Sequence, residues 1–179
     1  MLIIASYGED SAPNAMNAAW GGVADSSRIA MYLSGGHKTV KNILKRGAFT
    51  VSMGDAEHAA ACDYVGIESG NSVPDKVARA GFRVTKSEHV DAPMIDELPL
   101  ALECKLVSYD EETELLLGEV VKVAVYVVLG NRVDERALDE NGKLAVEKLH
   151  VITFDYANHG YYVLGEKVAS AFEDGKKFK

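Results

Sequence analysis

The residues whose types and spacing could do chemistry begin with a glycine-containing turn. Residues 34–39 read Ser-Gly-Gly-His-Lys-Thr, and apolar side chains follow at the i, i+3 and i+4 spacing of a helix over residues 40–44. Two glycines let a backbone approach a ligand closely. The first N–H groups of a helix have no internal partner and lie at the positive end of its dipole. With the cation of Lys38 and the hydroxyl of Thr39, this segment could bind a phosphate.

The same turn has a simpler interpretation. Ser34 or Thr39 could serve only as the N-cap of an ordinary strand-to-helix connection, because hydroxyl side chains are common helix caps. The residue types alone leave both interpretations open.

A second segment complements the first. Residues 14–20 read Asn-Ala-Met-Asn-Ala-Ala-Trp and predict a loop before a strand at residues 29–33. Small residues and amide side chains can line the edge of a flat ring, and Trp20 fits either the core or the edge of a cofactor. The two segments together therefore suit a flat aromatic cofactor with a phosphate tail.

The elements that must position these segments are mostly strands. Alternating apolar residues over 100–107 have the period of a half-buried strand. Many strands with few inserted helices favour a barrel over a parallel α/β sheet, in a single domain over residues 1–179. We expect strands at residues 29–33, 48–52, 100–107, 115–128 and 151–154, and helices at residues 40–46, 55–64, 74–80 and 164–172.

Five residues make these expectations specific. Gly47 is placed to cap the first helix in the left-handed conformation. Ser72 and Asp75 have the spacing of a capping box. Gly118 predicts a bulge or bend in its strand. Lys122 indicates which face of the same strand is exposed to solvent.

Composition describes an acidic globular protein. The 179 residues carry a net charge of −8, with 47% hydrophobic and 26% charged residues. An acidic chain without a basic patch disfavours nucleic acid as a partner. The sequence has no apolar stretch of about 18 residues and no leader pattern, so we expect no membrane association and a cytoplasmic location.

Other chemistries find little support. Neither a Rossmann fingerprint, a P-loop nor a nucleophile elbow is present. The five histidines are scattered without metal-ligand spacing, so we expect no metal site. Cys62, in an Ala-rich helix, and Cys104, on an apolar strand row, fit small buried hydrophobes better than redox-active thiols.

Eight motifs in order along the chain show a resemblance to a known family. The chain resembles the FMN-binding split-barrel proteins of the flavin-reductase-like family, and most closely the flavoredoxin branch. Three positions depart from that pattern. The family usually has Thr where this chain has Asn17, often Ser in place of Ala19, and often Asn in place of Ser52. The motifs lie at residues 14–20, 38–39, 63–70, 75–76, 92–93, 99–104, 118–120 and 161–166.

The resemblance implies a mainly β fold, a Greek-key split barrel with added helices. It also implies FMN as cofactor and a homodimer with the flavin at or near the subunit interface. Flavin carries the chemistry in such a protein, so no side chain is named as catalytic. The expected cofactor-binding residues are Asn14, Met16, Asn17, Ala18, Ala19, Trp20, Ser34, Gly35, Gly36, His37, Lys38, Thr39 and Ser52.

Three functions fit this sequence. The electron donor is expected to be a nicotinamide nucleotide or a redox protein, and the first two functions differ in whether a nicotinamide reduces the flavin at a useful rate. The first function is flavoredoxin-like electron transfer through tightly bound FMN. The second is an NAD(P)H-dependent flavin reductase that uses FMN as cofactor or substrate. The third is a non-enzymatic flavin- or haem-binding protein, or a split barrel without a cofactor.

Overall fold

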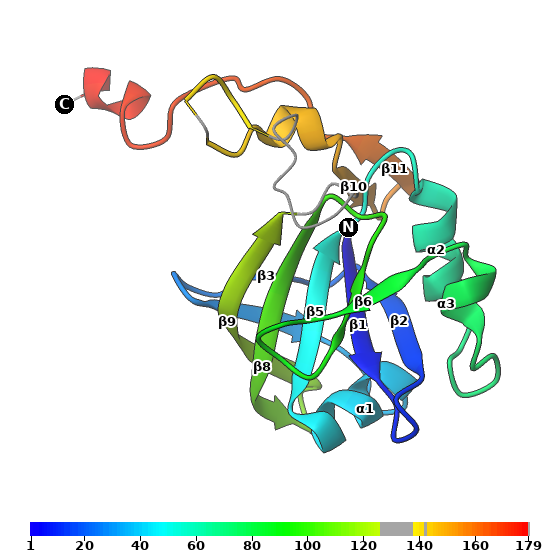
Figure 1. Ribbon diagram of the computed structural model, residues 1–179. Coiled ribbons are helices and arrows are strands. Elements are labelled where there is room, and N and C mark those ends of the chain that lie inside the picture. Colours follow the sequence, from blue (N-terminus) through cyan, green and yellow to red (C-terminus); the bar gives the residue numbers. More distant parts are fainter. Residues whose placement is uncertain (126–137, 142, 179) are drawn as a thin grey trace.

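A curled antiparallel sheet forms the body of the molecule (Figure 1). The computed structural model describes residues 1–125, 138–141 and 143–178. Among these residues the main sheet has the strand order β2-β1-β5-β8-β9-β4-β3. Neighbours that are distant in sequence, such as β1 and β5, require connections across the barrel ends, as in a Greek key. The strands are β1 (Leu2–Tyr7), β2 (Pro13–Ala18), β3 (Gly21–Val23), β4 (Arg28–Tyr32), β5 (Ala48–Met53), β8 (Leu100–Asp110) and β9 (Leu115–Val125). The predicted mainly β barrel with added helices is confirmed.

Helix α1 (Lys38–Arg46) closes one end of the barrel. Val40 and Ile43 are fully buried in the interior cluster, which also holds Phe49 of β5. The helix ends where the sequence predicted, because Gly47 adopts φ 67° and its N–H donates to the Ile43 carbonyl at 2.8 Å. The packing of Val40 and Ile43 therefore fixes the position of α1 against the sheet.

Two further helices cover the outer face of β1 and β2. These are α2 (Ala59–Ile67) and α3 (Lys76–Arg79), and they enclose a second apolar cluster with Ile3 of β1. Side chains alternate along a strand. Met16 and Ala18 of β2 therefore pack toward the barrel interior, whereas Asn17 faces α2.

Two hairpins and two short 3₁₀ segments complete the described chain. The hairpin of β10 and β11 lies at the barrel end opposite α1, near the N-terminus (Figure 1). The bounds are β6 (Val84–Lys86), β7 (Pro93–Ile95), β10 (Ile152–Asp155), β11 (Gly160–Val163), η2 (Val146–Leu149) and η3 (Asp174–Phe178).

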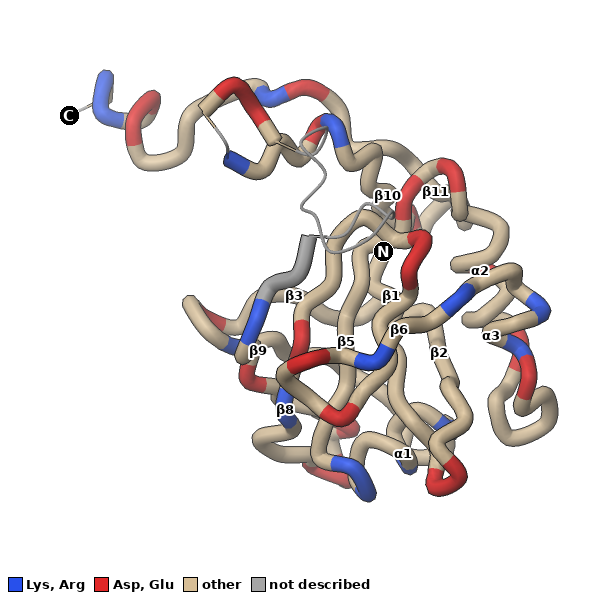
Figure 2. Tube along the Cα trace, viewed as in Figure 1, with Lys and Arg blue, Asp and Glu red and all other residues tan. Residues whose placement is uncertain are grey.

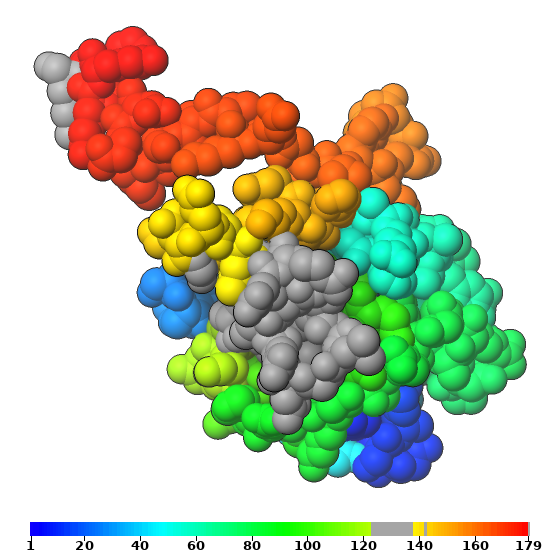
Figure 3. Space-filling view, turned by 45° about the horizontal axis from the view of Figure 1, so that its top comes forward, coloured from blue at the N-terminus to red at the C-terminus, as the bar shows by residue number. Residues whose placement is uncertain are grey.

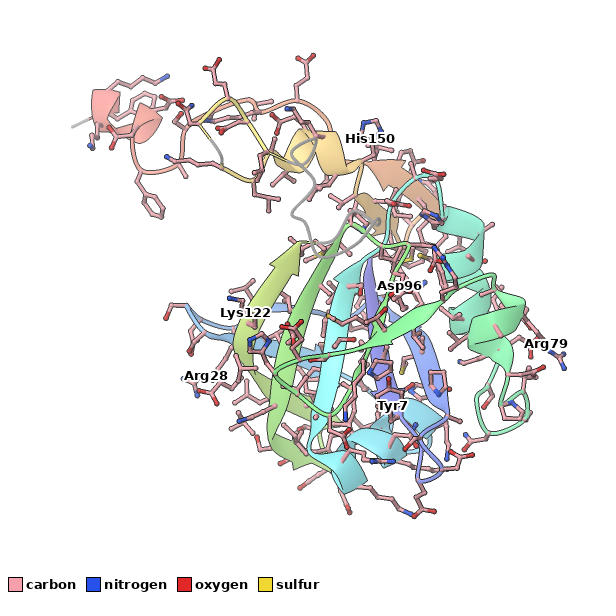
Figure 4. All side chains as sticks on the ribbon, in the orientation of Figure 1. Tyr7, Arg28, Arg79, Asp96, Lys122 and His150 are labelled. Carbon is pink, nitrogen blue, oxygen red and sulfur yellow. The ribbon has the colours of Figure 1, made fainter. Side chains whose placement is uncertain are left out.

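The β8–β9 pair agrees with the predicted bend. A Cβ on Gly118 would lie 2.4 Å from Cζ of Phe49, so only glycine lets this ring pack against β9. The register shifts between Leu106 and Ser108, next to the Leu106–Gly118 pairing. Lys122 projects from the outer face of β9 (Figure 4) and is exposed, as expected. Residues 126–128 of the predicted strand lie outside the described residues.

Several sequence predictions are wrong in detail. Residues 13–18 form strand β2 instead of a loop, because they pair along the whole of β1. The helix expected at residues 55–64 begins at Ala59 and ends at Ile67. The capping box does not form, since no side chain caps α3 and the Asp75 carboxylate instead accepts from Arg79 at 2.9 Å.

The helix expected over residues 164–172 is also wrong. The chain there is non-helical, and Val168 is 97% exposed. This segment runs along an arm that projects from the barrel (Figure 3). A short amphipathic sequence gains most of its helical stability from packing its apolar face, and this arm has no surface of the described chain beneath it.

Charged residues of both signs are interspersed along the chain (Figure 2). No helix among the described residues is long and apolar enough to cross a bilayer.

Candidate functional site

Two hollows meet along one wall formed by Gly66 and Ile67, at the end of α2. The Lys38 hollow, of about 160 Å³, lies between the start of α1 and the end of α2. The Asp63 hollow, of about 220 Å³, lies between β2, α2 and the β10–β11 hairpin. Because both hollows are lined by Gly66 and Ile67, they lie next to each other, and the two together are called the groove. Besides the shared wall, Met16, His37, Lys38, Thr39, Glu68, Ser69, Gly70 and Lys76 line the first, and Asn17, Ala19, Asp63, Phe154 and Tyr161 line the second.

The start of α1 supplies the positive end of this groove. His37 is the N-cap residue, and no side chain of the described residues caps the helix. Thr39 is tied elsewhere, since its Oγ1 accepts from Nδ2 of Asn14 at 2.6 Å. Neither Ser34 nor Thr39 is therefore the cap that the simpler interpretation required. The first N–H groups of α1 remain available to an anion beside Lys38.

A second cation, Lys76, lines the same hollow. Its side chain is 3% exposed, and Nζ donates to the carbonyls of Val65 at 2.8 Å and Glu68 at 2.6 Å. Burial lowers the pKa of Lys76 to about 8, against the opposing effect of Glu68. Arg79 on the same short helix points outward (Figure 4). The Lys76 ammonium is thus a buried and titratable hydrogen-bond donor at the same end of the groove as Lys38. Two of its N–H groups bind these carbonyls, and it has a third.

Two glycines allow the end of α2 and the segment after it to lie directly on β2. A Cβ on Gly70 would stand 2.0 Å from Oδ1 of Asn14, and one on Gly66 would stand 2.7 Å from Cβ of Asn17. The Asn14 oxygen is buried, with no hydrogen-bond partner among the described residues. Close approach at both glycines fixes this wall of the groove against β2.

The other end of the groove carries a short polar network. The Tyr161 hydroxyl donates to Oδ1 of Asp63 at 2.6 Å, and Nδ2 of Asn17 donates to the Tyr161 oxygen at 3.3 Å. Burial and the hydrogen bond to Asp63 raise the pKa of Tyr161 to about 12. The ring of Phe154 lies 5.6 Å from that of Tyr161. Aromatic faces and one carboxylate therefore enclose this end.

About half of the predicted cofactor-binding residues line the groove. They are Met16, Asn17, Ala19, His37, Lys38 and Thr39. Asn14 lies just behind Lys38 and lines a separate hollow of about 290 Å³, the Asp10 hollow, together with Lys38 and Gly70.

The remaining predicted residues are not brought into the groove. Ala18 packs in the barrel core. Trp20 is 57% exposed, with its ring 5.5 Å from that of Tyr156. The oxygen of Ser52 is buried on the sheet without a described partner. Ser34, Gly35 and Gly36 form the turn before α1, where the Gly36 carbonyl accepts from Asn71 at 3.1 Å.

The predicted site does not include the shared wall at Gly66 and Ile67, nor Asp63, Tyr161 and Lys76. The Asp-Tyr-x-Gly-x-x-Ser-Gly run at residues 63–70 was the available signal, since its two glycines are four residues apart. Nothing in the sequence alone says that this run lies on β2.

Both cysteines are fully buried, as expected for small hydrophobes. Burial raises the pKa of the Cys62 thiol to about 12 and that of the Cys104 thiol to about 12. A thiol held protonated is a poor nucleophile and electron carrier. Among the described residues no group of three His, Cys, Asp or Glu side chains could hold a metal ion.

We expect the Cys62→Ser, Cys104→Ser double variant to retain flavin content and the rate at which dithionite bleaches the flavin absorbance. Burying a hydroxyl in place of each thiol costs about 1–3 kcal/mol, so the melting temperature should fall. Stopped-flow absorbance checks the rate, and thermal unfolding checks the fold. Slow bleaching in a folded variant with full flavin content would show that a thiol takes part.

The fold is that of a split-barrel protein, and one end of its groove holds the uncapped start of α1 together with Lys38 and Lys76. A family model described as the flavin reductase like domain matches residues 1–145, and the chain belongs to this family. The predicted family resemblance is confirmed.

Solved structures agree with that assignment. The flavoredoxin of Desulfovibrio vulgaris (Miyazaki F) is 36% identical, with a TM-score of 0.88 over 97% of this chain and 91% of that one. A flavoredoxin from Methanosarcina acetivorans shares the fold at 23% identity, with a TM-score of 0.84 over 99% of this chain and 91% of that one. An FMN-binding domain of a flavin reductase-like enzyme from Shewanella baltica OS155 does so at 18% identity, with a TM-score of 0.80 over 94% and 87%. No protein with a curated description matches the chain.

Proposed function

We propose that the protein is a flavoredoxin-like redox protein that passes electrons through bound FMN. The observation that carries this proposal is the groove itself. One end combines the uncapped start of α1 with Lys38 and the buried Lys76, and the other end is lined by aromatic, amide and small residues. An anionic tail joined to a flat ring matches both ends.

The residues of the groove fit FMN in type. The N–H groups at the start of α1, together with Lys38 and Lys76, would hold the phosphate through charge-assisted hydrogen bonds. Met16, Gly66 and Ile67 would exclude water from one side of the ring. Asn17 would offer an amide to its edge. The bound flavin would supply the electron-transfer chemistry.

A nicotinamide-dependent flavin reductase is the second candidate. The ring centroids of the exposed Trp20 and Tyr156 lie 5.5 Å apart. The ring centroid of Tyr156 lies 6.4 Å from that of Phe154, which lines the Asp63 hollow. Aromatic rings of this kind offer a stacking surface to a second planar ligand, such as a nicotinamide.

Stopped-flow absorbance of the flavin-loaded protein separates the two candidates. Flavoredoxin-like transfer predicts that NADH and NADPH bleach the flavin slowly, whereas a reduced redox protein or dithionite bleaches it quickly. Fast bleaching by either nicotinamide nucleotide would favour the reductase. A protein that binds no flavin would contradict both.

The proposal includes a second copy of the chain as partner. Val168 and Phe172 are 97% and 94% exposed on the projecting C-terminal arm (Figure 3), and exposed apolar groups of this kind commonly mark an interface. Strand β9 offers less apolar surface to a partner, since Leu116 is fully buried and Glu119 is exposed.

We expect sedimentation velocity to show a dimer, and dilution that separates the dimer to release flavin. The double variant Val168→Ser, Phe172→Ser should sediment more slowly than wild type at equal concentration. The matched double variant Val107→Ser, Val121→Ser, at exposed positions on β8 and β9, should not. A monomer that keeps its flavin would contradict the interface site.

A further inference from the structure

One carboxylate lies at the aromatic end of the groove. Asp63 is the only charged side chain that lines the Asp63 hollow among the described residues. The two lysines of the groove line the other hollow, beyond the shared wall at Gly66 and Ile67. The two ends of the groove therefore differ in charge: one is lined by two lysines and Glu68, and the other by the single carboxylate of Asp63.

Three elements fix this carboxylate. Asp63 projects from α2, Tyr161 donates to it from β11 at 2.6 Å, and Asn17 of β2 donates to Tyr161 at 3.3 Å. Gly66 is packed against Asn17, so α2 cannot easily shift away from β2. A carboxylate bound at one oxygen in this way keeps its position next to a ligand in the hollow.

We propose that the Asp63 carboxylate, held by Tyr161, tunes the bound flavin by lowering its reduction potential. This inference rests on the proposed function and goes beyond it by assigning a role to Asp63. Reduction of a flavin by an external donor adds two electrons together with one or two protons, so electron density on the ring increases. A fixed negative charge beside the ring disfavours that increase, and the partly enclosed groove screens it less than bulk water would.

The test is the midpoint potential of FMN bound to the Asp63→Asn variant, measured with dithionite and a reference dye at saturating FMN. We expect the variant to bind reduced FMN about ten-fold more tightly relative to oxidised FMN than wild type does, which raises the midpoint potential by about 30 mV for a two-electron couple. The control is Asp110→Asn, which removes the same charge from the β8–β9 turn, where Asp110 accepts from Thr113.

A second variant separates charge from structure. Tyr161→Phe removes the hydrogen bond and keeps the carboxylate, so its midpoint potential should equal or fall below that of wild type. The inference is overturned if Asp63→Asn shifts the potential no more than Asp110→Asn does. A rise in Tyr161→Phe equal to that in Asp63→Asn would also overturn it. Failure of wild type to bind FMN would instead reject the proposed function, so the two failures are distinguishable.

Discussion

Lys38→Ala is expected to raise the dissociation constant of FMN by about ten-fold or more without unfolding the protein. Lys38 stands at the uncapped start of α1 and lines the hollow that also holds Lys76. A charge-assisted contact to phosphate contributes about 1.5–3 kcal/mol, and about 1.4 kcal/mol corresponds to a factor of ten. Fluorescence titration of the flavin-free protein with FMN measures the change.

Two comparisons make this result specific. Riboflavin lacks the phosphate, so its dissociation constant should hardly differ between Lys38→Ala and wild type. Lys45→Ala removes a cation from the last turn of the same helix, where Lys45 pairs with Glu9, and should leave FMN binding unchanged. Equal loss of FMN and riboflavin affinity in Lys38→Ala would mean that Lys38 supports the fold and does not contact the phosphate.

Lys76→Met is expected to weaken FMN binding by about ten-fold at pH 7 and to abolish most of its pH dependence. Burial lowers the pKa of Lys76 to about 8, so the ammonium of the free protein loses its proton between pH 7 and pH 9. The second ionisation of a phosphate monoester lies near pH 6, so the ligand charge is constant over this range. In wild type the dissociation constant of FMN should therefore rise from pH 7 to pH 9.

The same shift affects the stability of the flavin-free protein in the opposite direction. The folded-state pKa of about 8 lies below the ordinary value of 10.5. Between these values the unfolded chain binds the Lys76 proton and the folded chain does not, so the free energy of unfolding contributed by Lys76 rises with pH. Lys76→Met should remove this rise in urea unfolding at pH 8 and pH 10. Lys86→Met, at an exposed position on β6, should keep both pH dependences; loss of either one in that control would contradict the assignment to Lys76.

The sequence predicted the features whose causes are local. Gly47 ends α1 because its left-handed conformation is a property of glycine, and the alternation after Leu100 predicts β8 because half-buried strands have a period of two. Lys38 and Thr39 were placed at the start of a helix for the same kind of reason.

The rest depends on contacts between distant segments. Lys76 becomes a buried donor only because the end of α2 presents the Val65 and Glu68 carbonyls to it. Asp63 and Tyr161 are 98 residues apart in sequence, and only the packing of α2 beside the last hairpin joins them. The segment after Leu164 has the apolar spacing of a helix and yet is not helical. Its apolar side chains do not pack on any surface of the described chain. Local pattern cannot reveal which segments become neighbours.

The most direct test of the central claim is titration of the flavin-free protein with FMN and with riboflavin, followed by calorimetry or by quenching of flavin fluorescence. We expect one FMN per chain, held at least about ten-fold more tightly than riboflavin because Lys38, Lys76 and the start of α1 contact the phosphate. Equal affinity for the two flavins, or no binding of either, would contradict it.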